Sequence, residues 1–126
     1  MRKLKRSSET PIRRGRRVLR WEVDWATRYL LEGSRNHTWR ECRIRDLSRE
    51  GAGVELFETT AEEIGGHRVV LEAEVPPAVY RLVGEVRHMS DGIQGGVHVG
   101  VRFASLSAVE RAMLDSLLGR ESTAAK

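Results

Sequence analysis

The sequence holds a single cysteine, Cys42, among its 126 residues. A lone cysteine excludes an internal disulfide and a zinc site built from several cysteines. The chain also lacks an apolar run of membrane-spanning length, and its charged beginning, MRKLKRSSETPIRRGRR, is not followed by the apolar region of a secretory signal. These absences predict a soluble, cytoplasmic protein that does not insert into a membrane.

Common catalytic and phosphate-binding motifs are also missing. There is no G-x-S-x-G nucleophile motif, no Walker loop and no dinucleotide-binding glycine fingerprint. The four histidines lack the paired spacing of a metal site, which favours ordinary surface or strand positions for each of them. They are His37, His67, His88 and His98. We therefore expect no enzymatic activity, no metal and no cofactor.

The residues that are present suffice for one folded domain. Hydrophobic residues make up 40% of the chain and charged residues 32%, a balance that allows a core beneath a well-solvated surface. Compact domains commonly contain roughly 100 to 150 residues, so a second core would not fit. Both ends are polar and lack hydrophobic periodicity. We expect a flexible basic arm over residues 1–12, a domain over 13–119 and a flexible tail over 120–126.

Alternation of apolar and polar residues predicts about six β-strands. The first is long, because apolar residues recur at every second position from Trp21 to Leu31. Turn residues separate the others, and a loop or helical turn is expected around 60–66. The further strands are expected over 38–46, 53–57, 69–75, 80–88 and 97–103. Since no helix could serve as a parallel crossover, the predicted fold is mainly β, a six-stranded antiparallel barrel.

One helix is expected near the C-terminus. Ser107 and Glu110 have the S-x-x-E spacing of a capping box, and Gly119 is expected to end the helix. An apolar stripe runs between them, and such a stripe packs on its own domain more often than it binds a partner. Its members are Val109, Met113, Leu114, Leu117 and Leu118. We expect this helix to pack on the barrel.

Positive charge is concentrated at the beginning of the chain. Residues 1–20 contain nine basic residues and one acidic residue, so they carry a net charge of +8 and the other 106 residues together −4. Such an asymmetry favours an anionic partner, which could be nucleic acid, acidic lipid or a phosphorylated small molecule. A solvated tail that only aids solubility is the alternative.

Two groups of polar residues suit a phosphorylated purine. Arg16 and Arg20 present planar guanidinium groups that can bind phosphate or a guanine edge, and in an extended segment they lie about 13 Å apart on one side. Asp46 can accept hydrogen bonds from guanine, Ser48 can donate or accept, and Gly51 can adopt a positive φ beside a ligand. These three residue types also stabilise turns through local backbone hydrogen bonds, so a structural role stays open.

The order of these motifs resembles the PilZ domain family of cyclic di-GMP receptors. R-R-x-x-R is formed by Arg16, Arg17 and Arg20, and D-x-S-x-x-G follows over residues 46–51, after a strand. The later segments GEVRH and GVRF and the closing helix are also similar to the family. The resemblance spans roughly residues 13–118. It implies a six-stranded barrel flanked by a helix, with the ligand bound where the basic arm meets the barrel.

The resemblance also implies roles for the motif residues. The outer two arginines would bind the guanine edge and the phosphates, and Arg17 would be a supporting contact. Asp46 and Ser48 would hold the purine from the barrel side, and Gly51 would shape the loop.

Two positions leave alternatives open. Arg13 and Arg17 also stand four apart, but the strand pattern starts directly after Arg20, which favours the pair Arg16 and Arg20. Trp21 stands where the family more often has a smaller aliphatic residue, so it is either a core residue or a stacking surface. Its place in the strand alternation favours the core.

The resemblance implies a bacterial single-domain receptor that signals through an unidentified effector protein. Cyclic di-GMP would order the segment from about residue 10 to 20 against the barrel. One alternative is a nucleic-acid-binding barrel that uses the basic arm, but the tryptophans follow the barrel alternation rather than forming a base-stacking platform. The other is a PilZ-like protein-interaction module without nucleotide binding, and the intact motifs argue against it. Pathway, ligand stoichiometry and oligomeric state stay open.

Overall fold

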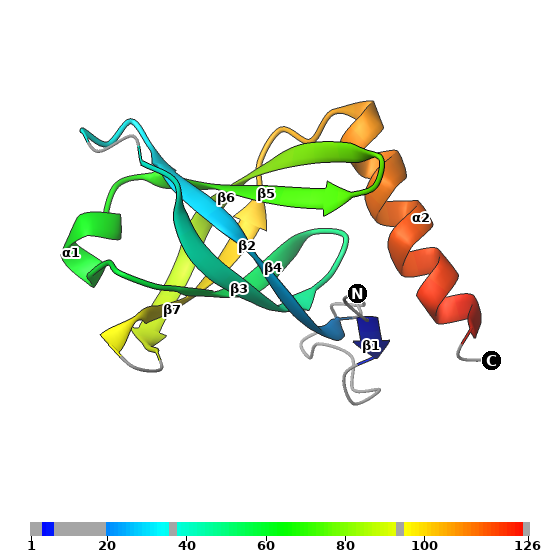
Figure 1. The fold of residues 1–126 in the computed structure, drawn as a ribbon, viewed down its shortest axis with the longest axis horizontal. Coiled ribbons are helices and arrows are strands. Elements are labelled where there is room, and N and C mark those ends of the chain that lie inside the picture. Colours follow the sequence, from blue (N-terminus) through cyan, green and yellow to red (C-terminus); the bar gives the residue numbers. More distant parts are fainter. Residues whose placement is uncertain (1–3, 7–19, 36–37, 93–94, 125–126) are drawn as a thin grey trace.

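The structure, a computed structural model, describes residues 4–6, 20–35, 38–92 and 95–124. Within these ranges the chain forms seven strands and two helices (Figure 1). The strands are β1 (Leu4–Arg6), β2 (Trp21–Glu32), β3 (Arg40–Leu47), β4 (Gly51–Leu56), β5 (Arg68–Val75), β6 (Ala78–Asp91) and β7 (Val97–Phe103). The helices are α1 (Ala61–Ile64) and α2 (Ala108–Ala124).

Six of the strands close into an antiparallel barrel. Their order is β2-β3-β4-β7-β6-β5, and β5 pairs back with β2. The long strand β2 makes this closure possible, because its first part pairs with β3 and its last residues, from Tyr29 onwards, pair with β5. The prediction of a mainly β, six-stranded antiparallel barrel is therefore confirmed.

The short strand β1 lies within the segment that the sequence places in an irregular arm. It pairs with the start of β2, with Leu4 opposite Val23 and Arg6 opposite Trp21. Among the described residues, β1 is the strand that pairs with this side of β2 before Tyr29, so β1 covers backbone groups that would otherwise form an open sheet edge there. Pairing through the backbone needs no hydrophobic periodicity, which is why the sequence pattern did not predict it.

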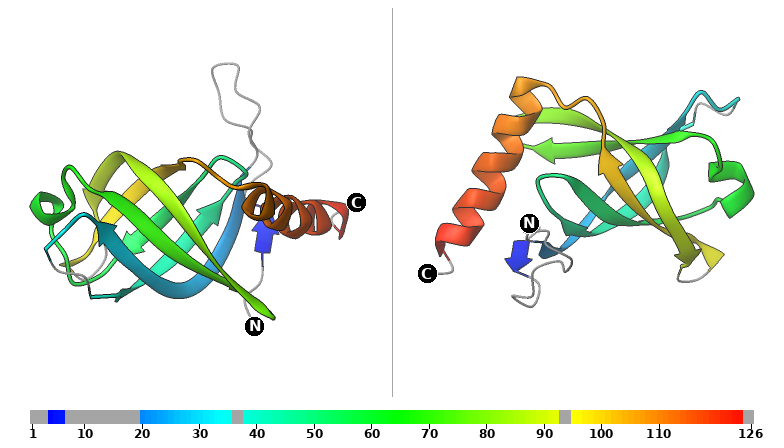
Figure 2. Two further views of the ribbon diagram at one scale, coloured as in Figure 1. Left: turned by 90° about the horizontal axis from the view of Figure 1, so that it is seen from above. Right: turned by 180° about the vertical axis from the view of Figure 1, so that it is seen from behind.

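The interior of the barrel holds the apolar faces of the strands. The alternation predicted for β2 is confirmed, and Trp21 is a core residue with 1% of its surface exposed. Cys42 also belongs to this core, and burial raises the pKa of its thiol to about 12. The two helices lie at opposite ends of the barrel (Figures 1 and 2). Ile64 of α1 and Leu114 and Leu118 of α2 join the same buried cluster, so each helix covers one end.

Helix α2 begins as the sequence predicts and ends later. The backbone N–H of Ser107 donates to Glu110 Oε1 at 2.9 Å, and that of Glu110 donates to Ser107 Oγ at 3.1 Å, which confirms the capping box. Val109 is 64% exposed, because the helix meets the core only from Met113 onwards. Gly119 does not end the helix, which continues to Ala124; a glycine inside a helix costs only about 1 kcal/mol relative to alanine.

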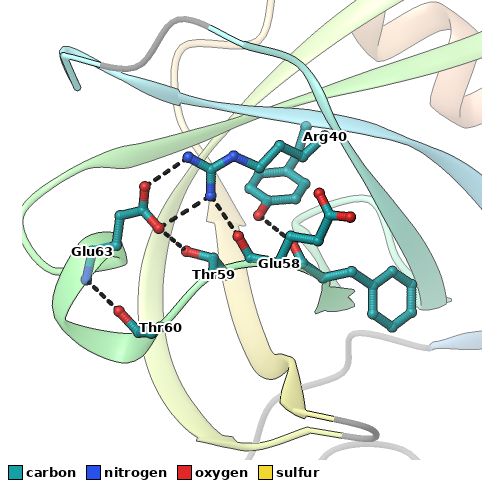
Figure 3. A network of polar contacts seen from close by, with 7 residues as sticks. Arg40, Glu58, Thr59, Thr60 and Glu63 are labelled. Atoms are coloured by element: carbon teal, nitrogen blue, oxygen red, sulfur yellow. Dashed lines mark hydrogen bonds and ion pairs between the residues drawn. The ribbon is translucent and has the colours of Figure 1, made fainter.

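A polar network holds α1 against β3 (Figure 3). The guanidinium group of Arg40 donates to both carboxylate oxygens of Glu63, at 3.1 and 2.6 Å, and to the carbonyl oxygen of Glu58 at 2.7 Å. Thr59 donates to Glu63 at 2.9 Å, and the hydroxyl of Thr60 accepts from the Glu63 backbone at 3.2 Å. Hydrogen bonds from Arg40 and then Thr59 lower the pKa of Glu63 to about 2.

Candidate functional site

The carboxylate of Asp46 faces outward because β3 contains a bulge. Ile44 and Asp46 pair with consecutive residues of β4, so Arg45 is an extra residue on β3. Without that insertion, strict alternation would place Asp46 on the inner face with Ile44. Instead Ile44 and Leu47 are buried, while 24% of the Asp46 side chain is exposed.

Asp46 lies beside Arg20, the last arginine of the predicted motif. Its Oδ1 atom accepts a hydrogen bond from the backbone N–H of Gly53 at 3.0 Å and lies 3.5 Å from Nη1 of Arg20. Almost half of the Arg20 side chain is exposed, and an exposed ion pair of this kind contributes less than about 1 kcal/mol. A ligand could therefore rearrange this pair at small cost. The structure thus brings together two site residues that are 26 positions apart.

Ser48 stabilises the turn between β3 and β4. Its hydroxyl accepts hydrogen bonds from the backbone N–H groups of Glu50 and Gly51, both at 3.1 Å, and its own N–H donates to the Gly51 carbonyl at 2.9 Å. This is the local role that serine commonly has in turns. Arg49, the next residue, reaches Asp115 of α2 at 2.7 Å and ties the turn to the helix. Contact between Ser48 and a ligand stays a prediction.

Gly51 does not use the positive φ that glycine can adopt. In the described residues the glycines with positive φ are Gly33, Gly66 and Gly95. A β-carbon at Gly51 would lie 2.1 Å from the carbonyl oxygen of Val101 on β7. Gly51 is therefore required by the close approach of β4 and β7. These strands are distant in sequence, so the local turn pattern could not reveal this reason.

A row of paired residues crosses the outer face of four strands. Asp46 of β3 pairs with Gly53 of β4, which pairs with Gly100 of β7. Gly100 in turn pairs with His88 of β6. A β-carbon at Gly53 would lie 2.5 Å from Asp46 Oδ2, and one at Gly100 would lie 2.1 Å from His88 Nε2. The carboxylate of Asp46 thus lies over Gly53, and the imidazole of His88 lies over Gly100, at opposite ends of the row.

This row belongs to a surface pocket of about 300 Å³, a volume at the lower end of the range for small-molecule sites. Arg20, Asp46, Ser48 and Gly51 all line it. The opposite wall, from β6 and β7, was not assigned to the site from the sequence. It contributes Arg87, His88, His98 and Arg102. Their segments, GEVRH and the strand ending in GVRF, carried part of the family resemblance, but only the register of the barrel shows that they face the D-x-S-x-x-G turn.

The two pocket histidines are strand residues, as expected, and they differ in their partners. Nδ1 of His98 lies 3.0 Å from Oε2 of Glu55, a carboxylate on a residue that is only 6% exposed. The rings of His88 and His98 have centroids 6.4 Å apart. The ring of His98 is therefore positioned by Glu55 of the neighbouring strand β4. His88 instead extends over Gly100 into the pocket.

The remaining expected site residues, Arg16 and Arg17, lie outside the described residues, and so do Arg13 and His37. Among the residues that are described, no group of three histidine, cysteine, aspartate or glutamate side chains is placed to hold a metal ion. Over the same ranges, no helix combines the length and the apolarity that crossing a membrane requires.

Comparisons with known proteins agree with this geometry. The family model described as PilZ domain matches residues 11–120. The PilZ domain with c-di-GMP of YcgR from Escherichia coli is 18% identical, with a TM-score of 0.61, over 88% of this chain and 95% of that chain. The crystal structure of YcgR in complex with c-di-GMP, also from Escherichia coli, gives 18% identity and a TM-score of 0.60, over 89% of this chain and 48% of that chain.

The inhibitor of motility MotI/DgrA from Bacillus subtilis is 14% identical, with a TM-score of 0.61, over 89% of this chain and 53% of that chain. The chain thus spans about half the length of these last two structures. No curated protein sequence matches the chain significantly. The structural likeness shows a shared fold, and the family model covers most of the sequence. The chain belongs to the PilZ domain family.

Proposed function

We propose that this protein is a bacterial, cytoplasmic receptor for cyclic di-GMP that signals through a partner protein. The observation that carries the proposal is the meeting of Arg20 and Asp46, 3.5 Å apart, at a surface pocket. Each comes from one of the two motifs that resemble the ligand-binding motifs of the family. Two similar structures, both of YcgR from Escherichia coli, contain c-di-GMP.

The chemistry of the pocket suits guanine. Asp46 uses Oδ1 to accept from Gly53, which leaves Oδ2 to accept from the adjacent N–H donors of a guanine edge. Adenine presents an acceptor beside its donor on that edge, so a carboxylate pairs with it less well. Arg20, joined by Arg16 and Arg17, would bind the phosphates and the remaining base edge.

The signal would arise from ordering of the arginine segment on ligand binding. Fixing the backbone of residues 10–20 costs about 1 to 2 kcal/mol per residue, and charge-assisted hydrogen bonds between arginines and two phosphates would offset that cost. The surface that the ordered segment and the barrel then form together would bind the effector protein. No reaction is required of the domain.

Titration calorimetry with cyclic di-GMP, GTP and cyclic GMP tests this proposal. We expect cyclic di-GMP to bind most tightly. Arg20→Ala and Asp46→Ala should each raise its Kd at least tenfold, because hydrogen bonds to charged groups contribute about 1.5 to 3 kcal/mol. Arg111→Ala is the matched control, since it removes an exposed arginine on α2, away from the pocket lining. No heat with cyclic di-GMP, or equal affinity for all three nucleotides, would reject the proposal.

A further inference from the structure

The wall of the pocket opposite Asp46 contains a second bulge. On β6, Val86 pairs with Val101 and His88 pairs with Gly100, so Arg87 is an inserted residue. In a regular strand, consecutive side chains point to opposite faces. Here the consecutive residues Arg87 and His88 are both exposed, and both line the pocket. Bulges commonly redirect side chains beside functional sites.

Arg102 reaches the same wall from the neighbouring strand. It pairs with Gly51 of β4, and it lies two positions from Gly100, on the same face of β7. Its side chain is exposed and lines the pocket together with Arg87. Two strands that meet at a bulge thus present two guanidinium groups to one pocket.

These two arginines differ from others on the surface in having no acidic partner. Arg28 and Arg68, for example, hold carboxylates at 2.9 and 2.6 Å. Within the part of the chain that the structure describes, neither Arg87 nor Arg102 forms an ion pair or a hydrogen bond through its side chain. The described acidic residues that line the pocket are Asp46 and Glu50, and both lie on or beside the β3–β4 turn. Glu85 of β6 pairs with Arg102 in the sheet register, but it does not line the pocket and no ion pair joins the two. The described part of the β6–β7 wall that lines the pocket therefore carries cationic side chains and no carboxylate.

We propose that Arg87 and Arg102 form a second phosphate-binding subsite, on the wall opposite Arg20 and Asp46. The inference rests on the proposed cyclic di-GMP function and concerns the same pocket. A cyclic dinucleotide carries two phosphates on opposite sides of its ring. One phosphate binds the N-terminal arginines and the other binds Arg87 and Arg102, where planar guanidinium groups can each donate two hydrogen bonds. His88 belongs to the same β6–β7 wall and lies over Gly100, so it faces the ligand beside this subsite.

This arrangement selects ligands by the number of their phosphates. A nucleotide with one phosphate can occupy only one wall at a time and leaves the other arginines without an anion. Both walls contribute only when the phosphates lie on opposite sides of the ligand. The β6–β7 wall therefore raises the affinity for a cyclic dinucleotide more than the affinity for cyclic GMP.

Calorimetry on single and double variants tests the subsite. Arg87→Ala and Arg102→Ala should each raise the Kd for cyclic di-GMP about tenfold and the double variant about a hundredfold, with little change for cyclic GMP. Arg111→Ala, an exposed arginine outside the pocket, should leave both values unchanged. Thermal melting verifies that each variant is folded, and Arg87→Gln with Arg102→Gln replaces any alanine variant that is not.

The possible failures are distinguishable. If the wild type binds cyclic di-GMP and all Arg87 and Arg102 variants bind it equally well, the subsite is overturned while the proposed function stands. If the wild type does not bind cyclic di-GMP, the proposed function fails, and pyrophosphate becomes the probe. Pyrophosphate binding that the double variant loses then supports a phosphate subsite on this wall, and binding that is absent or unchanged overturns it.

Discussion

Gly51 and Gly53 of β4 have different neighbours. We therefore expect alanine substitutions at the two positions to differ in their effects on stability and ligand affinity. At Gly53 the added carbon would lie 2.5 Å from the end of the Asp46 side chain, which can rotate away. We expect Gly53→Ala to lower the melting temperature moderately, because the rotated carboxylate no longer accepts the hydrogen bond from the backbone N–H of residue 53. It should also raise the Kd for cyclic di-GMP about tenfold, because the displaced carboxylate no longer faces the base. Calorimetry and thermal melting measure the two effects.

Gly51→Ala is the matched comparison. Its added carbon would lie 2.1 Å from a backbone carbonyl oxygen of β7, which cannot move without separating two paired strands. We expect a loss of stability of at least about 1 to 3 kcal/mol, the usual cost of overpacking. Wild-type affinity in Gly53→Ala, or an unchanged melting temperature in Gly51→Ala, would contradict this account of the two glycines.

Residue chemistry made part of the site predictable. Arg20 and Asp46 could be chosen from the sequence because a fork of donors and a pure acceptor suit a guanine nucleotide and because their motifs resemble those of the PilZ family. The structure brings the two residues together. Ser48 and Gly51 were chosen for the same ligand, yet each also has a structural role. The hydroxyl of Ser48 accepts backbone hydrogen bonds in the turn, and Gly51 allows the close approach of β7. Arg87 could not be assigned to the site, because its direction depends on a bulge and on the register with β7.

At the scale of elements, the network between Arg40 and Glu63 predicts how acid affects α1. The pKa of Glu63 is lowered from 4.5 to about 2, first by hydrogen bonds from Arg40 and then by Thr59. A carboxylate with a lowered pKa contributes stability above its unfolded value, and this contribution is lost as pH falls. We expect Glu63→Gln to be less stable than the wild type at pH 7 and to lose less stability between pH 4.5 and pH 2.

Urea unfolding at several pH values between 7 and 2 provides the measurement. Glu62→Gln is the control, since Glu62 is the preceding residue of α1, is exposed and forms none of the hydrogen bonds of the network. The control should follow the pH dependence of the wild type. Equal pH dependence in Glu63→Gln and the wild type would show that the Arg40 contact does not stabilise the fold.

The elements also show where sequence patterns stop being informative. The alternation in β2 and β7 predicted those strands because every second residue there is buried or half-buried. In β2 this holds although the pairing with β3 shifts register between Glu22 and Trp25. In β3 and β6 the alternation shifts at Arg45 and Arg87, where bulges insert one residue. A bulge cannot be recognised from alternation alone, since it requires the partner strand. Both of these bulges lie beside the pocket, so the pattern is least informative where the site is built.

At the scale of the whole molecule, the two helices leave the side wall of the barrel, where the pocket lies, uncovered (Figure 2). Helices α1 and α2 cover opposite ends (Figure 2), and the pocket lies on the outer face across β3, β4, β7 and β6. These strands form a continuous surface only because the barrel places β7 between β4 and β6. The two walls of the pocket are thus held by one sheet. The ordering that we propose on ligand binding concerns the N-terminal arginine segment instead.

Limited proteolysis of the intact protein tests whether ligand binding orders the arginine segment. Trypsin cleaves after arginine, and the segment RRGRR over residues 13–17 offers several sites. If cyclic di-GMP binds Arg16, Arg17 and Arg20 against the barrel, saturating ligand should slow cleavage in this segment several-fold, because a protease needs an extended, accessible chain. Cleavage after Arg35, an exposed residue between β2 and β3 that does not line the pocket, provides an internal reference. Asp46→Ala should require at least tenfold more ligand for the same protection, since it removes the acceptor on the barrel side without changing any cleavage site. Cleavage of RRGRR at the same rate with and without saturating ligand would show that binding does not order the arginine segment.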